Sequence, residues 1–228
     1  MRAGLMIFVA AMTALAGAAR AQDLGEAARR IEGPGVVFTR ALNKAEGWVS
    51  RQGEVLTLTS PAKSDAFRDP DGKTSVNTAP ILLLDVDNRA PFTFVGKLTP
   101  SFAATYDAGA VYVWVRDDLW LKFAMERDER GKTRIVTVRT DKTSDDNNHD
   151  VVTAPSVHLK VSSDTRTIGF YYSVDGETWQ LVRLFKNDYP ARLAVGVSAQ
   201  SPTGEGNVVR IEQLSLESRA IADFRLGK

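Results

Sequence analysis

The 228-residue sequence contains no cysteine and only two histidines, His149 and His158. Without cysteine there is no disulfide, no thiolate nucleophile and no cysteine-ligated zinc or iron–sulfur centre. Two histidines leave little for an imidazole metal site or a proton relay. The sequence also lacks Gly-x-Ser-x-Gly, His-Glu-x-x-His and phosphate-binding-loop motifs. Any reaction carried out by this chain would therefore depend on carboxylates.

Excess charge of one sign is also missing, because 29 Lys and Arg face 28 Asp and Glu. Nucleic-acid binding needs a clustered basic excess to neutralise phosphates, so no nucleic-acid partner is expected. The composition is 43% hydrophobic and 25% charged, which is typical of a folded globular protein. The length suits one sandwich-sized domain or two small ones.

The first 21 residues have the features of a secretory signal peptide. Arg2 precedes an uncharged apolar run from Gly4 to Ala19, and Ala19-Arg20-Ala21 provides the small residues of a cleavage site. This run is shorter than the roughly 20 residues that a membrane-spanning helix needs. Cleavage after Ala21 is thus favoured over a membrane anchor, and no later run approaches a span. We expect an exported protein, periplasmic or secreted, with no transmembrane segment after cleavage.

From residue 36 onward the chain alternates short apolar or β-branched runs with turn residues such as Gly, Asp, Asn and Pro, the pattern of an all-β sandwich or barrel. We expect residues 22–35 to be a lead-in (a helical turn or disordered), residues 36–217 one sandwich domain, and residues 218–228 a tail that packs back or frays. The predicted strands are Val55–Thr59, Ile81–Val86, Phe92–Leu98, Ala110–Arg116, Leu119–Glu126, Ile135–Thr140, His158–Val161, Thr167–Ser173, Thr178–Leu184, Leu193–Gln200 and Val208–Leu216.

One turn is predicted in detail. The segment Ser173–Trp179 places Asp175-Gly176 between two strand-like runs, which predicts a two-residue hairpin because Gly accepts a positive φ. The string also resembles the sialidase Asp-box, but it is one residue short of that pattern and has no repeated copies.

Alternation within Ala110–Arg116 and Leu119–Glu126 separates two faces. Val111, Val113 and their partners form an aliphatic face for the core. We expect Val136 and Val138 to point inward too, with Thr137 outward. The opposite, outward face gathers aromatic and charged side chains, namely Tyr112, Trp114, Arg116, Trp120, Lys122 and Glu126. In Leu193–Gln200 the matching set is small and then polar (Ala194, Gly196, Ser198 and Gln200), which suits the floor of a groove.

Aromatic rings beside planar polar side chains suit a carbohydrate, because ring faces meet the C–H faces of a pyranose and the polar groups meet its hydroxyls. The same alternation fits a second buried layer, covered by residues 22–51 or by the tail. Both interpretations remain open at this stage.

Several motifs in order resemble a known family. They are Phe94-x-Gly96-Lys97, Tyr106-Asp107-Ala108-Gly109-Ala110, Trp120-Leu121-Lys122-Phe123, Tyr171-Tyr172-Ser173-x-Asp175-Gly176 and Val195-Gly196. Between Val36 and Leu216 the chain resembles the bacterial "regulation of enolase protein one-like" family, a domain of unknown function in the concanavalin A-like lectin/glucanase superfamily. The resemblance implies a jelly-roll β-sandwich of two antiparallel sheets, whose concave sheet binds or cleaves glycans elsewhere in the superfamily. Fold alone does not imply function.

We therefore expect a lectin-like protein that binds a saccharide on its concave sheet through Tyr112, Trp114, Arg116, Trp120, Lys122, Glu126 and Gln200. The alternative is a glycoside hydrolase or polysaccharide lyase with Glu126 as acid/base. Superfamily glucanases often carry Glu-x-Asp-x-x-Glu, and here Glu126-Arg127-Asp128 is followed by Gly131 in the last position. A second alternative is a structural envelope protein without a small ligand.

Asp141 and the run Asp145-Asp146-Asn147-Asn148-His149-Asp150 predict an oxygen-rich loop. Such oxygens suit Ca²⁺, and lectins of the superfamily often hold a metal near the site, but the Asp-x-Asp-x-Asp-Gly spacing is absent. A polar hairpin loop explains the run as well. We expect no cofactor, with calcium as the one candidate, and the oligomeric state is left open.

Overall fold

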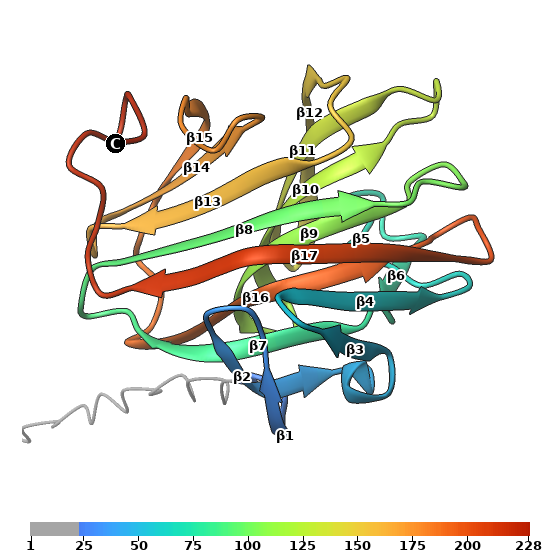
Figure 1. Ribbon diagram of the computed structural model, residues 1–228, viewed down its shortest axis with the longest axis horizontal. Coiled ribbons are helices and arrows are strands. Elements are labelled where there is room, and N and C mark those ends of the chain that lie inside the picture. Colours follow the sequence, from blue (N-terminus) through green and yellow to red (C-terminus); the bar gives the residue numbers. More distant parts are fainter. Residues whose placement is uncertain (1–22) are drawn as a thin grey trace, which may run out of the picture.

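The computed structural model describes residues 23–228 and shows two large antiparallel sheets packed face to face (Figure 1). This jelly-roll β-sandwich confirms the predicted fold class. The predicted signal peptide, residues 1–21, lies outside the described residues. Across residues 23–228 no helix has the length and apolar character needed to cross a membrane.

The first sheet has eight strands and carries the site described below. In spatial order they are β1 (Glu26–Glu32), β2 (Val37–Leu42), β7 (Ile81–Asp87), β16 (Arg192–Gln200), β9 (Ala108–Arg116), β10 (Leu119–Arg127), β11 (Thr133–Asp141) and β12 (Thr143–Val151).

The second sheet has seven strands. In spatial order they are β15 (Gln180–Lys186), β14 (Thr167–Ser173), β13 (Val157–Ser163), β8 (Phe92–Pro100), β17 (Gly206–Glu217), β4 (Val55–Pro61) and β3 (Val49–Gln52). A short 3-10 turn, η1 (Ala45–Gly47), precedes β3. The strands β5 (Ala66–Arg68) and β6 (Ser75–Asn77) form a separate two-stranded sheet.

All eleven predicted strands are present, but the lead-in prediction is wrong. Residues 26–32 form β1, which pairs with β2 at the edge of the eight-stranded sheet. Its sequence suggested a helix or disorder because an edge strand buries few side chains, and only Ala28 and Ile31 pack against the core. Residues 218–228 do pack back, since Tyr171 Oη donates to the Phe224 carbonyl at 2.8 Å.

The Asp175 turn has the expected chemistry but a different length. β14 ends at Ser173 and β15 begins at Gln180, so the connection is longer than a two-residue hairpin. The Asp175 carboxylate accepts from the Glu177 and Thr178 amides and from the Ser173 hydroxyl, which organises the wider turn. These bonds lower the pKa of Asp175 well below its ordinary value. Gly176 has φ +81°, as a turn glycine requires.

The main core lies between the two sheets and contains the aliphatic face predicted from alternation, including Val111, Val113, Leu121 and Phe123. It continues into the seven-stranded sheet, where Phe170 stacks on Phe123 with ring centroids 4.9 Å apart.

A second hydrophobic cluster covers the outer face of the eight-stranded sheet. Residues 62–80, which connect β4 to β7 and include β5 and β6, lie over this face and are called the cover segment below. Ala66 and Ala79 belong to the same buried cluster as Tyr112, Trp114 and Trp120. Close approach is possible because the facing residues of β16 are small, and Ser198 donates to the Pro80 carbonyl. The small set predicted as a groove floor is thus covered largely by the chain itself.

Val136 and Val138 belong to this outer cluster, so the prediction that they face the inter-sheet core is wrong. Thr137 points to the opposite side and contacts the His149 ring at 3.0 Å. Pairing with β10 fixes this choice, since Val138 stands opposite Lys122 and Val136 opposite Ala124. Both faces of β11 are buried, so polarity alone did not reveal which residues face the core.

Substitution of Trp114 tests the outer cluster. Trp114 is 1% exposed, stacks on Trp120 with centroids 6.2 Å apart and donates from Nε1 to the Asp23 carbonyl. We expect Trp114→Ala to lower the free energy of unfolding by about 3–5 kcal/mol. Denaturant titration measures this loss. The matched control is Trp48→Ala, because Trp48 is 40% exposed and should change stability by about 1 kcal/mol or less. Equal losses from both variants would contradict the buried arrangement.

Candidate ligand-binding cavity

A cavity of about 260 Å³ opens on the outer face of the eight-stranded sheet, beside the cover segment. Its walls come from the cover segment, the loop before β9, strands β10, β11, β12 and the end of β16. The lining residues are Asp65, Phe67, Tyr106, Lys122, Glu126, Glu129, Val136, Val138, Asp146, Asn148 and Gln200.

Cross-strand rows of side chains explain why the cavity forms here. In one row Gln200, Ala108 and Glu126 stand side by side on β16, β9 and β10. In the next row Ala110 on β9 stands opposite Ala124 on β10. These alanines are small and buried, so the long polar side chains of Lys122, Glu126 and Gln200 can meet above them.

Lys122 lines this cavity and is only 3% exposed. Its Nζ donates to the Ala66 carbonyl and to Gln200 Oε1, each at 3.2 Å, and lies 3.8 Å from Asp65 Oδ1. A buried ammonium is costly without partners, and these three oxygens supply them. Lys122 therefore ties the cover segment to β10 and β16.

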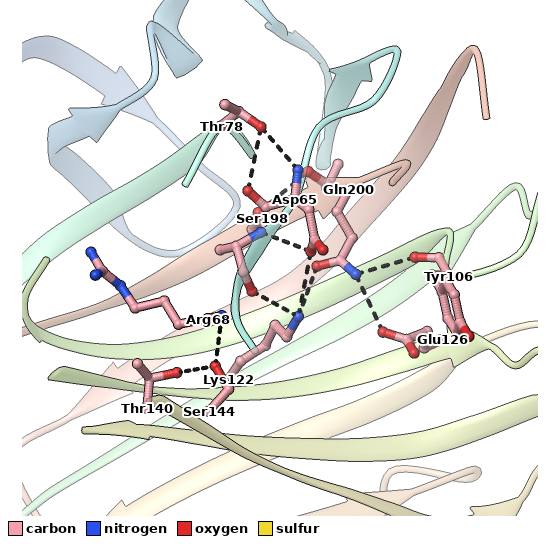
Figure 2. Close-up of polar contacts among 12 residues, drawn as sticks. Asp65, Arg68, Thr78, Tyr106, Lys122, Glu126, Thr140, Ser144, Ser198 and Gln200 are labelled. Carbon is pink, nitrogen blue, oxygen red and sulfur yellow. Dashed lines mark hydrogen bonds and ion pairs between the residues drawn. The ribbon is translucent and has the colours of Figure 1, made fainter. Parts of the chain in front are cut away.

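Gln200 extends the same network toward Glu126 (Figure 2). While its Oε1 accepts from Lys122, its Nε2 donates to the Tyr106 carbonyl at 3.1 Å and to Glu126 Oε2 at 3.3 Å. The amide oxygen and the amide NH2 group of Gln200 both have partners, and these hydrogen bonds fix the position of its side chain.

The loop before β9 places Tyr106 over the cavity. Asp107 is fully buried and accepts from the Ala103 and Ala104 amides and from the Ser201 hydroxyl. Tyr106 has φ +66°, in the left-handed region, which is uncommon for a side chain of this size. Tyr106 is 38% exposed, in contrast to the buried aromatic residues of the sheet.

Glu126 is the most perturbed acid in the cavity. Burial removes water from its carboxyl group and raises the pKa to about 8, with further contributions from Asp146, Asp65 and Glu129, while Lys122 acts in the opposite direction. At neutral pH the group is therefore mostly protonated, and it can donate a hydrogen bond as well as accept one.

The structure divides the predicted site residues into three groups. Lys122, Glu126 and Gln200 line the cavity together. Arg116 does not, because its Nε bonds Asp118 Oδ1 at 2.7 Å at the far end of β9.

The aromatic part of the predicted site is wrong. Tyr112, Trp114 and Trp120 are at most 1% exposed beneath the cover segment and Leu24, so their rings cannot stack on a ligand in this arrangement. Alternation identified their common face correctly but gave no information about what covers it. This burial is what the structural-protein alternative expects, and a ligand would have to bind in the cavity beside these rings.

Sequence reasoning missed the residues that complete the cavity. Tyr106 belongs to the Tyr106–Ala110 motif, but its place at the cavity depends on the left-handed backbone conformation of the loop at this residue. Asp65 and Phe67 come from a segment whose polar, turn-rich sequence predicts no strand. Asp146 and Asn148 were placed in a loop, whereas residues 143–151 form strand β12.

The strand also changes the arrangement of the acidic residues that were considered for calcium. Along β12 the side chains alternate, so Asp146 faces the cavity, while Asp145 stands opposite Arg139 on the other face. Neighbouring carboxylates therefore do not converge as they would in a loop. Within residues 23–228 no three His, Cys, Asp or Glu side chains group as a metal site. Asp128 is used by the turn after β10, where it bonds Arg134 Nε at 2.6 Å.

A second cavity, of about 420 Å³, lies on the outer face of the seven-stranded sheet beneath the tail. Its buried amine, Lys160, already donates to the Gly227 carbonyl at 2.8 Å and lies 3.5 Å from the Trp179 ring centroid. The tail therefore satisfies the main polar group there, which makes the first cavity the stronger candidate.

The pKa of Glu126 predicts a pH-dependent stability. Because the folded-state pKa of about 8 lies above the value of about 4.3 in an unfolded chain, the folded protein binds more protons between these limits. The contribution of Glu126 is full below about pH 4 and is lost as the pH rises toward 8. Glu126→Gln should stabilise the protein at pH 8 by a few kcal/mol and change little at pH 4. Denaturant titrations at several pH values measure the difference, and parallel curves for the two proteins would contradict it.

The sequence matches the model of a family of proteins of unknown function, DUF1349, over residues 42–219. No curated protein matches the chain. The enolase label carried by the predicted resemblance is not confirmed.

Solved structures share the fold. A functionally unknown protein from Saccharomyces cerevisiae has a TM-score of 0.72 at 24% identity, covering 79% of this chain and 96% of its own. A mutant of the GH43 protein BlXynB from Bacillus licheniformis has a TM-score of 0.63 at 16% identity, covering 86% of this chain but 39% of its own. Alginate lyase A1-II', of polysaccharide lyase family 7, has a TM-score of 0.50 at 7% identity, covering 76% and 84%.

At these identities the likeness shows the fold alone, a sandwich that also occurs in carbohydrate-related proteins. The match to the family model covers most of the sequence, from the end of β2 to the start of the tail. The chain therefore belongs to the DUF1349 family of proteins of unknown function.

Proposed function

We propose that this protein binds a saccharide in the cavity formed by Tyr106, Lys122, Glu126 and Gln200. The observation that carries the proposal is the composition of that cavity. An exposed tyrosine ring and Phe67 stand beside an ordered network of amide and carboxyl groups. A sugar needs both, an apolar face for its C–H groups and directed polar groups for its hydroxyls.

The size of the cavity limits the ligand. Its volume of about 260 Å³ is below the roughly 300–1,000 Å³ of sites for drug-sized molecules. One sugar ring, or the end of a glycan chain, fits such a space better than a long stretch of polysaccharide. The protonated Glu126 and the fixed Gln200 amide would then select the orientation of that ring.

Two further considerations support the proposal. Sandwiches of similar fold occur in a GH43 protein and in an alginate lyase, although those activities belong to those proteins. The amino-terminal sequence favours export, and an exported protein meets glycans in the periplasm or outside the cell.

Binding can be measured by calorimetric titration of a panel of mono- and disaccharides. We expect Tyr106→Ala to weaken binding at least about tenfold (about 1.4 kcal/mol), because it removes the exposed ring over the cavity. Trp48→Ala removes another exposed ring, remote from the cavity lining, and should leave the affinity unchanged. Equal affinity of Tyr106→Ala and the unmodified protein would count against this site.

A second candidate function, glycoside hydrolysis or polysaccharide cleavage, is favoured by one observation. Glu126 has the raised pKa of a general acid, and further carboxylates, Asp65 and Asp146, line the same cavity. The reaction would require Glu126 to protonate the leaving oxygen while a second carboxylate acts as nucleophile or base.

Incubation with a panel of polysaccharides, with measurement of the new reducing ends that cleavage produces, tests this second function. If the protein is an enzyme, Glu126→Gln should reduce turnover by at least about a hundredfold while sugar binding persists. Binding without turnover in the unmodified protein would instead identify a lectin-like binder.

A further inference from the structure

We propose that the cavity selects a saccharide carrying a protonated amine, such as a glucosamine unit, over neutral sugars and uronates. This inference rests on the proposed saccharide-binding function and adds the charge of the ligand.

Carboxyl groups outnumber basic groups around the cavity. Asp65, Glu126, Glu129 and Asp146 line it, and Lys122 is the one basic side chain among the lining residues of the described chain. A charged ligand entering this space meets mainly carboxyl groups, and low-dielectric surroundings strengthen its interaction with those that are ionised.

Lys122 is not free to neutralise an acidic ligand. An ammonium has three donors, and the Ala66 carbonyl, Gln200 Oε1 and Asp65 Oδ1 surround this one. Its charge is also matched by the Asp65 carboxylate (Figure 2). A uronate would therefore have to break this buried network or remain beside other carboxylates without a partner.

Glu126 offers an unfilled acceptor to a cation. The residue is 8% exposed and lines the cavity. Its Oε2 accepts from Gln200, whereas its other oxygen has no hydrogen bond within residues 23–228. An ammonium beside this oxygen favours the ionised carboxylate over the protonated form, so Glu126 releases its proton to solvent and accepts a charge-assisted bond from the ammonium.

Two further acids, Asp146 and Glu129, line the cavity. Asp146 makes no side-chain ion pair within the described residues, and Glu129 Oε1 lies 3.8 Å from an exposed Arg130 Nε. Asp146 stands in the same cross-strand row as Lys122, with Val138 between them. The face of Tyr106 adds a surface on which an ammonium is attracted by the ring.

Four disaccharides separate the ligand classes in a calorimetric titration at low salt and about pH 6.5, where an amine of pKa about 8 is protonated. They are the glucosamine dimer, its N-acetylated counterpart, cellobiose and a uronate dimer. N-acetylation keeps the ring but removes the charge. We expect the glucosamine dimer to bind at least about tenfold more tightly than its N-acetylated form, and the uronate dimer to bind most weakly.

Adjacent residues of β12 provide a matched pair of variants. Asp146→Asn removes a charge that faces the cavity and should reduce the preference for the amino sugar at least about threefold, while Asp146→Glu should retain it. Asp145→Asn makes the same change in net charge on the opposite face of the strand, beside Arg139, and should leave the preference unchanged. Equal effects of the two Asn variants would show that only net charge matters and would overturn the inference.

The possible failures can be told apart. If cellobiose or the uronate dimer binds as tightly as the glucosamine dimer, the inference about charge is wrong and the saccharide-binding function stands. If none of the four binds at millimolar concentration, the proposed function fails and the inference fails with it.

Discussion

One buried ammonium connects the fold of this protein to its site. Lys122 brings together the cover segment, β10 and β16 through the Ala66 carbonyl, Asp65 and Gln200. Removing a partner from a buried, hydrogen-bonded charge costs several kcal/mol of stability, so these groups hold one another in place. Gln200 in turn fixes Glu126 and the Tyr106 loop. The cavity is thus built by the same interaction that fastens the cover segment to the sheet.

Much of the fold but only part of the site could be predicted from the sequence. Period-two alternation correctly placed Lys122 and Glu126 on one face. Antiparallel pairing then places Gln200 in the same cross-strand row as Glu126. Alternation separates two faces but does not say what lies over each of them. For that reason Trp114 and Trp120 were expected in a groove, although residues distant in sequence bury them. Tyr106 and Asp65 depend on loop geometry, for which the sequence carries no periodic pattern.

A group of small residues beside the cavity distinguishes this face of the sheet from a uniformly packed one. Ala108, Ala110 and Ala124 are buried between large side chains, and the acids that line the cavity determine its charge. The fold itself is shared with proteins that differ in activity and identity, so it cannot define a ligand. The side chains that line the cavity, including the buried and mostly protonated Glu126, would determine the ligand.

The most direct test of the account is nuclear magnetic resonance mapping of sugar binding on the isotope-labelled protein. Addition of the tightest-binding sugar should shift the side-chain amide of Gln200 and the backbone amides around Tyr106 and Asp146, while Lys160 and Trp179 in the second cavity remain unchanged. Shifts confined to the second cavity, with Gln200 and Tyr106 unaffected, would contradict the central claim that the cavity beside the cover segment is the binding site.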